Sequence, residues 1–293
     1  MLSESISNLH NAIEENNIDT IIEIICSKSQ SQIKKLNNQY ETEYKVNLKE
    51  TLEKKLKDEL KDLIIALLQD PIEYDANEVY KSIKGLGTDD DALIELIATR
   101  TPNRLKEVSK KYFEMRNVSM DFDIKNDTSQ AYGKLITEMS KGERNENPYP
   151  NIKKIKDICD ELTKEIGGGK IDKDIFVKYF SELSFFELRM LYNVFEKEKD
   201  MNIIEFINEK FGSDSRKLYQ TFFSYLIDPY KYFAQRIHLW KDKIVIRIIV
   251  SQRDSLEEIK KKYKVLYDKN LVDDIKENTK DAFQKALLKI VGE

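Results

Sequence analysis

The chain has 293 residues, of which 40% are hydrophobic, and its 49 basic and 53 acidic residues give a net charge of -4. That hydrophobic fraction is enough to build a buried core, so the chain is expected to be globular. The balanced charge argues against a general nucleic-acid binder, which needs an excess of basic residues on one face. The sequence contains no run of 18 apolar residues and does not start like a signal peptide, so we expect a soluble intracellular protein.

Helical periodicity runs through the chain. Only five prolines and nine glycines occur, and apolar residues recur at three- and four-residue steps, as in residues 56–68, LKDELKDLIIALL. Strand-like alternation bounded by turn residues is hard to find. The sequence therefore predicts an all-α protein.

The two cysteines lie in apolar segments and lack metal-site or redox-motif spacing. Free cysteines are among the most frequently buried residues. We expect Cys26 and Cys159 to be free thiols in the core.

Four segments share one pattern: an apolar helix, a polar corner and a second helix that ends in an aromatic residue. They are TIIEIICSKSQSQIKKLNNQY, DALIELIATRTPNRLKEVSKKY, IFVKYFSELSFFELRMLYNVF and KIVIRIIVSQRDSLEEIKKKY. With Lys28, Arg100, Leu183 and Gln252 as equivalent corners, the spacings are 72, 83 and 69 residues. A period of about 70 residues predicts four structural repeats.

The repeats are expected at residues 1–70, 71–140, 151–227 and 228–293. Residues 141–150, KGERNENPYP, hold charged residues, asparagines and two prolines, which is typical of a linker. Each repeat also closes with an apolar helix, and helices of this kind bury their apolar faces against one another. Each repeat is therefore expected to form a compact helical bundle.

The stretch at residues 83–91, IKGLGTDDD, contains two of the nine glycines. Gly85 and Gly87 can adopt positive φ and turn backbone carbonyls toward a common point. Thr88 is expected to start the next helix, with Asp91 completing a capping box. A plain turn before a helix explains this loop as well as a binding site does.

A second feature is separated from Thr88 by 38 residues: Asp127, in KNDTSQ, at a cap-like position before a helix. This pattern resembles the annexin family, whose type II calcium site is GxGT followed after 38 residues by Asp or Glu. Residues 79–108, VYKSIKGLGTDDDALIELIATRTPNRLKEV, resemble an annexin repeat along their length, and the four repeats extend the resemblance to essentially the whole chain. It implies an all-α core of four annexin-like repeats, each a compact bundle of about five short helices.

The resemblance also implies a set of calcium ligands: the backbone carbonyls of Ile83, Gly85 and Gly87 and the carboxylate of Asp127. Calcium takes six to eight oxygens, so these atoms fill only part of its shell, and a lipid phosphate is a natural completing ligand. Calcium and membrane should then bind cooperatively. Lys84 and Thr88 are expected to contact lipid, although Lys84 can also be an ordinary solvated lysine.

The first and fourth repeats depart from this pattern. In the first, EENNID replaces the glycine loop and Lys55 takes the place of Asp127. In the fourth, the loop is shortened and the neutral Asn278 stands at the cap position. Both repeats are expected to have lost this type of site.

The third repeat is ambiguous. Gly167 and Gly169 lie in the right loop, and Asp214 lies 31 residues past its corner, where the second repeat has 27. An insertion at residues 196–202 would absorb the difference. The loop is either a second calcium site or a merely flexible glycine loop. Such loss of sites is similar to the divergent annexins of protists, including the alpha-giardins.

Other sites are excluded. Residues 121–130 contain alternating acids but lack the central glycine of an EF-hand, and Tyr132 stands where its glutamate belongs. The GGGK stretch lacks the spacing of a phosphate-binding loop, and no catalytic combination has local support. We expect no enzyme activity.

The sequence thus predicts a calcium-dependent binder of acidic phospholipid membranes, cytoplasmic and peripheral on the inner face of membranes. The alternative is a structural scaffold that binds cytoskeletal elements or a protein partner, with calcium incidental. Neither interpretation involves nucleic acid.

Overall fold

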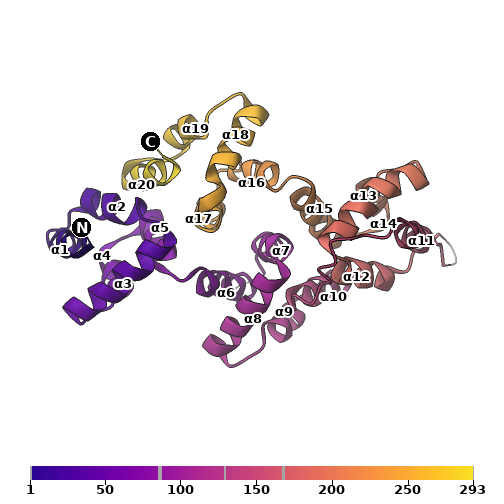
Figure 1. The fold of residues 1–293 in the computed structure, drawn as a ribbon, viewed down its shortest axis with the longest axis horizontal. Helices are drawn as coiled ribbons and strands as arrows, with labels where there is room; N and C mark the ends of the chain where they lie inside the picture. Colours follow the sequence, from indigo (N-terminus) through magenta and orange to yellow (C-terminus); the bar gives the residue numbers. More distant parts are fainter. Residues whose placement is uncertain (1, 85–87, 129, 167–168, 293) are drawn as a thin grey trace. The chain divides into compact units, whose positions relative to one another are not determined.

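The computed structural model describes residues 2–84, 88–128, 130–166 and 169–292. In these residues the chain forms twenty α-helices and one short 3-10 helix, and the only β pairing is an isolated bridge between Glu165 and Ile171 (Figure 1). The prediction of an all-α fold is confirmed. No helix in the described part of the chain is both long and apolar enough to cross a membrane.

Each repeat contributes five α-helices, as expected. The first repeat contains α1 (Leu2–Glu14), α2 (Ile18–Cys26), α3 (Gln30–Tyr44), α4 (Leu48–Lys55) and α5 (Asp58–Leu68). The second contains α6 (Pro71–Ile83), α7 (Asp90–Thr99), α8 (Pro102–Arg116), α9 (Met120–Asp127) and α10 (Gln130–Ser140). The third contains α11 (Ile152–Thr163), α12 (Lys173–Glu182), α13 (Phe185–Lys199), α14 (Ile203–Lys210) and α15 (Ser213–Ile227). The fourth contains α16 (Pro229–Ile237), α17 (Asp242–Ser251), η1 (Arg253–Ser255), α18 (Leu256–Tyr267), α19 (Leu271–Asn278) and α20 (Asp281–Val291).

The repeats pair into two compact units that do not follow chain order. Unit 1 combines Met1–Tyr74 with Tyr230–Glu293, and unit 2 is Asp75–Pro229. Within unit 1, α2 packs against α20 and α5 packs against α17. Within unit 2, α7 packs against α15 and α10 packs against α12. Apolar faces left over within one repeat are thus buried against a helix of another repeat.

The predicted corners lie where a third helix begins. In the first three repeats the residue after the corner, Ser29, Thr101 or Ser184, accepts a hydrogen bond from the first turn of that helix. Ser29 and Ser184 form complete capping boxes, which satisfy two backbone N–H groups that the helix itself leaves unpaired. In the fourth repeat the corner leads into η1 instead.

Each third helix carries a fully buried aromatic residue, 12 residues past the corner in the first three repeats and 11 past it in the fourth: Tyr40, Tyr112, Phe195 and Tyr263. The hydroxyl of Tyr112 donates to Asp123 Oδ2 at 2.7 Å, and the hydroxyl of Tyr263 donates to Asp274 Oδ2. These bonds join the third helix of a repeat to its fourth helix. In the second repeat that fourth helix is α9, which ends in Asp127.

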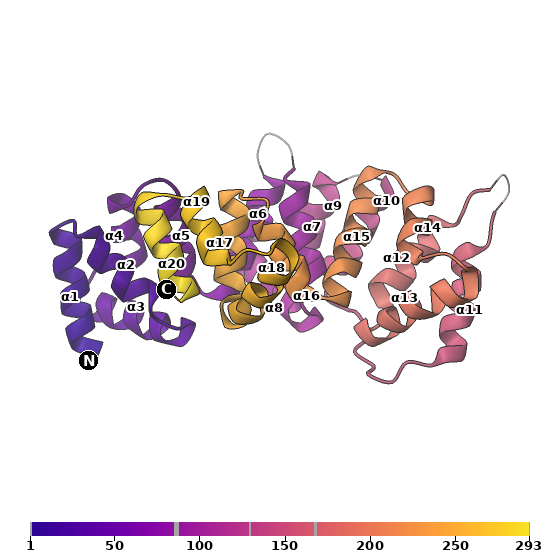
Figure 2. The ribbon, with the colours of Figure 1, turned by 90° about the horizontal axis from the view of Figure 1, so that it is seen from above.

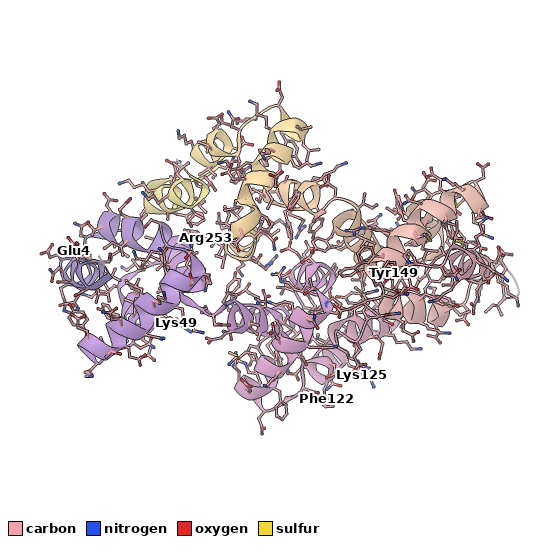
Figure 3. The ribbon with its side chains drawn as sticks, viewed as in Figure 1. Glu4, Lys49, Phe122, Lys125, Tyr149 and Arg253 are labelled. Atoms are coloured by element: carbon pink, nitrogen blue, oxygen red, sulfur yellow. The ribbon has the colours of Figure 1, made fainter. Side chains whose placement is uncertain are left out.

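Both cysteines are free and fully buried, as predicted. Within unit 1, Arg253 donates a hydrogen bond to the backbone carbonyl of Cys26 (Arg253 is labelled in Figure 3). The thiol of Cys26 therefore lies in the core that the first and fourth repeats build together.

The segment predicted to be a linker is anchored by one buried side chain. Arg144 donates to the backbone carbonyls of Leu183 and Phe180, and its guanidinium lies over the rings of Phe185 and Phe222. It is only 9% exposed. The segment between α10 and α11 is therefore fixed to unit 2 at Arg144.

Candidate calcium site

The two halves of the predicted site lie together in unit 2. Ile83 is the last residue of α6, and Asp127 is the last residue of α9. The hydroxyl of Thr88 donates to Asp127 Oδ2 at 2.6 Å. One turn earlier on α9, Asp123 Oδ1 lies 3.5 Å from Lys84 Nζ. The connection between α6 and α7 is thus held against the end of α9 at both of its described sides.

Two helix C-termini converge at this connection. The last carbonyls of a helix have no intrahelical partner and carry partial negative charge. At the end of α6, the N–H of Asp89 donates a hydrogen bond to the carbonyl of Ser82 at 2.8 Å. The carbonyl of Ile83 follows directly, and the side chain of Ile83 is buried, which fixes the backbone. The negative ends of α6 and α9, together with an exposed carboxylate, favour a bound cation.

The start of α7 differs from the prediction. The predicted capping box of Thr88 and Asp91 is wrong, because Asp89 is the N-cap and accepts from the N–H of Ala92 at 3.1 Å. The hydroxyl of Thr88 instead donates its hydrogen bond to Asp127, and Asp91 forms an ion pair with Lys217. Asp127 ends α9, so it does not stand at the head of α10 as expected.

Two tyrosines hold neighbouring carboxylates in place. The hydroxyl of Tyr132 donates to Asp90 Oδ1 at 2.9 Å, as that of Tyr112 does to Asp123. Burial, followed by the nearby carboxylates, raises the pKa of Tyr132, and burial and the hydrogen bond to Asp123 raise the pKa of Tyr112. Both phenols therefore stay protonated and donate at neutral pH. Asp127 has the hydroxyl of Thr88 as its partner instead of a tyrosine.

A metal site here would depend on backbone oxygens. Gly85 and Gly87 lie outside the described residues, so their carbonyls remain a prediction. In the described residues, no group of three or more His, Cys, Asp or Glu side chains is arranged to hold a metal ion. One carboxylate beside a helix C-terminus nevertheless fits a cation that accepts carbonyl oxygens, and calcium is such a cation.

The fourth helices of the four repeats end in different residues: Lys55, Asp127, Lys210 and Asn278. A basic side chain is favourable at a helix C-terminus, and an acidic one is unfavourable. Asp127 is therefore the one acid among these four positions, and it is locally costly for α9. Such a local cost is expected at a functional position.

This alignment changes the reading of the third repeat. The insertion expected at residues 196–202 is wrong, because α13 has 15 residues like α8, and α14 has 8 like α9. Lys210 therefore corresponds to Asp127, whereas Asp214 is the second residue of α15. Gly167 lies outside the described residues, and Gly169 has a φ of 73°. Calcium binding by Gly167, Gly169 and Asp214 stays an untested prediction.

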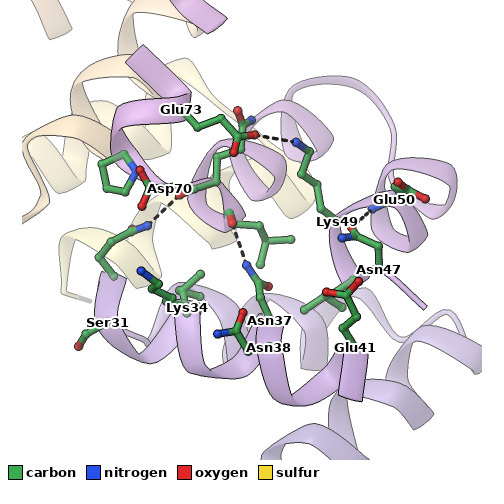
Figure 4. Close-up of a pocket in the computed structure, with 16 residues that line it drawn as sticks. Ser31, Lys34, Asn37, Asn38, Glu41, Asn47, Lys49, Glu50, Asp70 and Glu73 are labelled. Carbon is green, nitrogen blue, oxygen red and sulfur yellow. Dashed lines mark hydrogen bonds and ion pairs between the residues drawn. The ribbon is translucent and has the colours of Figure 1, made fainter. Parts of the chain in front are cut away.

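Sequence reasoning did not point to a pocket in the first repeat. The pocket has a volume of about 580 Å³ and lies between α3, α4 and the start of α6 (Figure 4). Asn37 donates to the Leu68 carbonyl at 2.8 Å, and Lys49 Nζ lies 3.3 Å from Glu73 Oε1. Charges of both signs thus line this pocket and partly pair with one another.

Comparison with known proteins identifies relatives along the whole chain. The family model Annexin matches residues 7–67, 74–139 and 240–290. Annexin A1 of Bos taurus is 29% identical over 304 aligned residues, covering 99% of this chain and 87% of the relative. The solved structure of annexin III has a TM-score of 0.96 at 25% identity and covers 100% of this chain and 94% of that chain. The calcium-bound structure of alpha-14 giardin, at 16% identity, shares the fold with a TM-score of 0.84 and full coverage of both chains.

Proposed function

This chain belongs to the annexin family, and we propose on that premise that it binds acidic phospholipid membranes in a calcium-dependent manner through its second repeat. The calcium ion is held by the carboxylate of Asp127 and by the backbone carbonyls of Ile83, Gly85 and Gly87. A lipid phosphate completes the oxygen shell. The chain acts as a binding protein and not as an enzyme.

The hydrogen bond from Thr88 to Asp127 is the observation that carries this proposal. It joins the loop to an acid 39 positions further along the chain and fixes the orientation of the carboxylate. Groups that orient a metal ligand in this way contribute to metal affinity. The acid is also kept at a position where helix electrostatics disfavour it, which supports a role outside folding.

Lys84 is placed to contact a headgroup phosphate. Its side chain is 48% exposed, and its contact with Asp123 is long for an ion pair, at 3.5 Å. Asp123 also accepts the hydrogen bond of the Tyr112 hydroxyl, so it keeps a partner when the partly exposed ammonium of Lys84 moves from Asp123 to a phosphate. Thr88 contributes by orienting Asp127, and its hydroxyl is committed to that bond.

The test is cosedimentation of the full chain with phosphatidylserine vesicles over a range of calcium concentrations. Asp127→Asn removes the charged ligand and should raise the calcium concentration for half-maximal binding by at least about 10-fold. Asp121→Asn is the matched control, because it removes the same charge from the other end of α9 and should bind as the wild type does. Equal calcium-dependent binding by Asp127→Asn and wild type would overturn the proposal. A wild type that never pellets with vesicles would favour a scaffold that binds a protein partner.

A further inference from the structure

At the position where the second repeat has Asp127, the third repeat has a positively charged side chain, Lys210. Lys210 ends α14, and its Nζ lies 3.7 Å from Oε1 of Glu165 in the connection between α11 and α12. The ammonium also lies 5.9 Å from the centre of the Phe206 ring. The side chain is 27% exposed, so it is partly held by the protein and still open to solvent.

We propose that Lys210 replaces calcium in the third repeat, and that it binds the headgroups of an anionic membrane without calcium, together with the described residues 164–166 and 169–172 of the connection between α11 and α12. This inference deepens the proposed function and rests on it for the membrane as partner. It assigns the third repeat a calcium-independent role, in contrast to the second.

The charge around the two connections supports this division. Residues 164–174 hold the basic side chains Lys164, Lys170 and Lys173 and the acids Glu165, Asp172 and Asp174. Glu165 is paired with Lys210 at 3.7 Å, and Asp174 is paired with Lys134 at 2.8 Å. With these pairs counted, basic side chains outnumber acidic ones in the connection, which favours contact with anionic lipid.

The second repeat has the opposite balance. The acids of the α6–α7 connection, the start of α7 and the end of α9 are Asp89, Asp90, Asp91, Asp123 and Asp127. Three basic residues accompany them: Lys84 and Lys217, which pair with Asp123 and Asp91, and Lys125 in the last turn of α9. Such a surface repels an anionic membrane unless a cation is bound. At this end of the molecule's two equivalent repeats, the second repeat therefore needs calcium to bind an anionic membrane, whereas the third repeat provides the positive charge through its lysines.

An exposed apolar side chain favours a membrane over a soluble phosphate as the ligand of this connection. Ile166 is 57% exposed, and its N–H donates to the carbonyl of Lys170 at 2.7 Å. The bridge between Glu165 and Ile171 closes the base of the turn, and Ile171 is buried. Ile166 is therefore held outward among lysines. At a bilayer surface the lysines reach phosphates while the apolar side chain enters the acyl boundary, whereas a free phosphate would leave Ile166 in water.

The two connections also lie on the same side of unit 2. Figure 2 shows the chain leaving α6 and α11 toward the same side, where α9 and α14 end. Both repeats of unit 2 can therefore face one membrane surface at once. Two linked contacts raise the overall affinity through effective concentration.

The test measures the partition of the full chain onto phosphatidylserine vesicles in the presence of a calcium chelator at low ionic strength. The wild type should bind measurably, and added salt should weaken this binding because it screens exposed charges. Lys210→Glu and Ile166→Asp should each lower the partition coefficient about fivefold or more. Lys153→Glu makes the same charge change near the other end of α11 and should have a much smaller effect.

Each outcome decides one of the two ideas. Lys210→Glu should keep the calcium-dependent increment, and Asp127→Asn should keep the chelator-resistant binding. The inference is overturned if the wild type does not bind vesicles in the presence of the chelator, or if Lys210→Glu binds them as well as the wild type does. Neither result contradicts the proposed function. Binding that inorganic phosphate abolishes beyond the effect of equal ionic strength, with Ile166→Asp like wild type, shows a soluble-phosphate site and overturns the membrane assignment.

Discussion

The carboxylate of Asp75 is held by both Nε and Nη2 of Arg100, at 3.0 and 2.9 Å, in the interior of unit 2. Arg104 Nε adds a third contact at 2.9 Å. Asp75 lies on α6, Arg100 is the C-cap residue directly after α7, and Arg104 lies on α8. This cluster therefore fixes the two helices whose connection carries the candidate calcium site.

Loss of this carboxylate should destabilise the protein strongly. Asp75→Asn takes from the buried guanidinium of Arg100 the carboxylate that it bonds through two nitrogens, and breaking a buried pair in this way costs about 3–5 kcal/mol. Urea unfolding followed by circular dichroism measures the loss. Asp157→Asn, an exposed change on α11, should stay within about 0.5 kcal/mol of wild type. A small effect of Asp75→Asn would mean that the cluster does not hold the repeat together.

The same cluster predicts a pH dependence. Burial alone would raise the pKa of Asp75, but Arg100 and then Arg104 outweigh it and hold the pKa below 3.8. The carboxylate therefore stabilises the fold fully above pH 3.8, and this contribution declines as the pH falls from 3.8 through the lower folded-state pKa. The stability difference between wild type and Asp75→Asn should be constant above that value and shrink below it. A constant difference down to the acid transition would contradict this assignment.

Removal of the hydroxyl of Thr88 should weaken calcium binding without unfolding the protein. Thr88→Val keeps the shape of the side chain but leaves Asp127 without its hydrogen-bond donor. Partners that orient a metal ligand contribute about 10-fold or more to affinity. Calorimetric calcium titration in the presence of vesicles measures this change. Thr42→Val, which removes a hydroxyl bonded only to the backbone of its own helix, serves as the control.

Gly142 is predicted to be irreplaceable in the turn after α10. Its φ is 67°, and an added Cβ would lie 2.4 Å from the carbonyl oxygen of Pro102. Gly142→Ala should cost about 3 kcal/mol or more, because backbone strain adds to this clash. Gly212→Ala is the matched change, since that position has open space and a φ of -75°, and it should cost below about 1 kcal/mol. Similar melting temperatures for the two variants would refute the predicted strain.

The two thiols should be unreactive in the folded protein. Burial raises the pKa of Cys26 to about 12 and that of Cys159 to about 11. Because the thiolate is the reactive form, iodoacetamide at pH 8 should leave both residues unmodified until urea unfolds the chain. Ser27→Cys places a thiol at an exposed neighbouring position and should be alkylated in the native state. Mass spectrometry of the native protein that finds Cys26 or Cys159 alkylated would contradict their burial.

Local pattern was enough to predict most of the fold. Helix periodicity is a property of neighbouring residues, so the helices and the four corners at Lys28, Arg100, Leu183 and Gln252 follow from the sequence. The same 27-residue count from corner to fourth-helix end that reaches Asp127 also reaches Lys210 from Leu183. The sequence contained this signal, and the assumption of an insertion concealed it.

The amino-acid sequence by itself determined the all-α class and the four repeats, because both depend on periodicity along the chain. The link between the 83–91 loop and Asp127 came from the resemblance of their spacing to the annexin signature. Only the tertiary structure decided that the first repeat packs with the fourth and the second with the third. It also decided that the hydroxyl of Thr88 donates to Asp127 and does not cap α7, and that Lys210 lies close to Glu165. These contacts join residues far apart in the chain, and they form because apolar helix faces must be buried together, which brings the ends of particular helices within hydrogen-bonding reach.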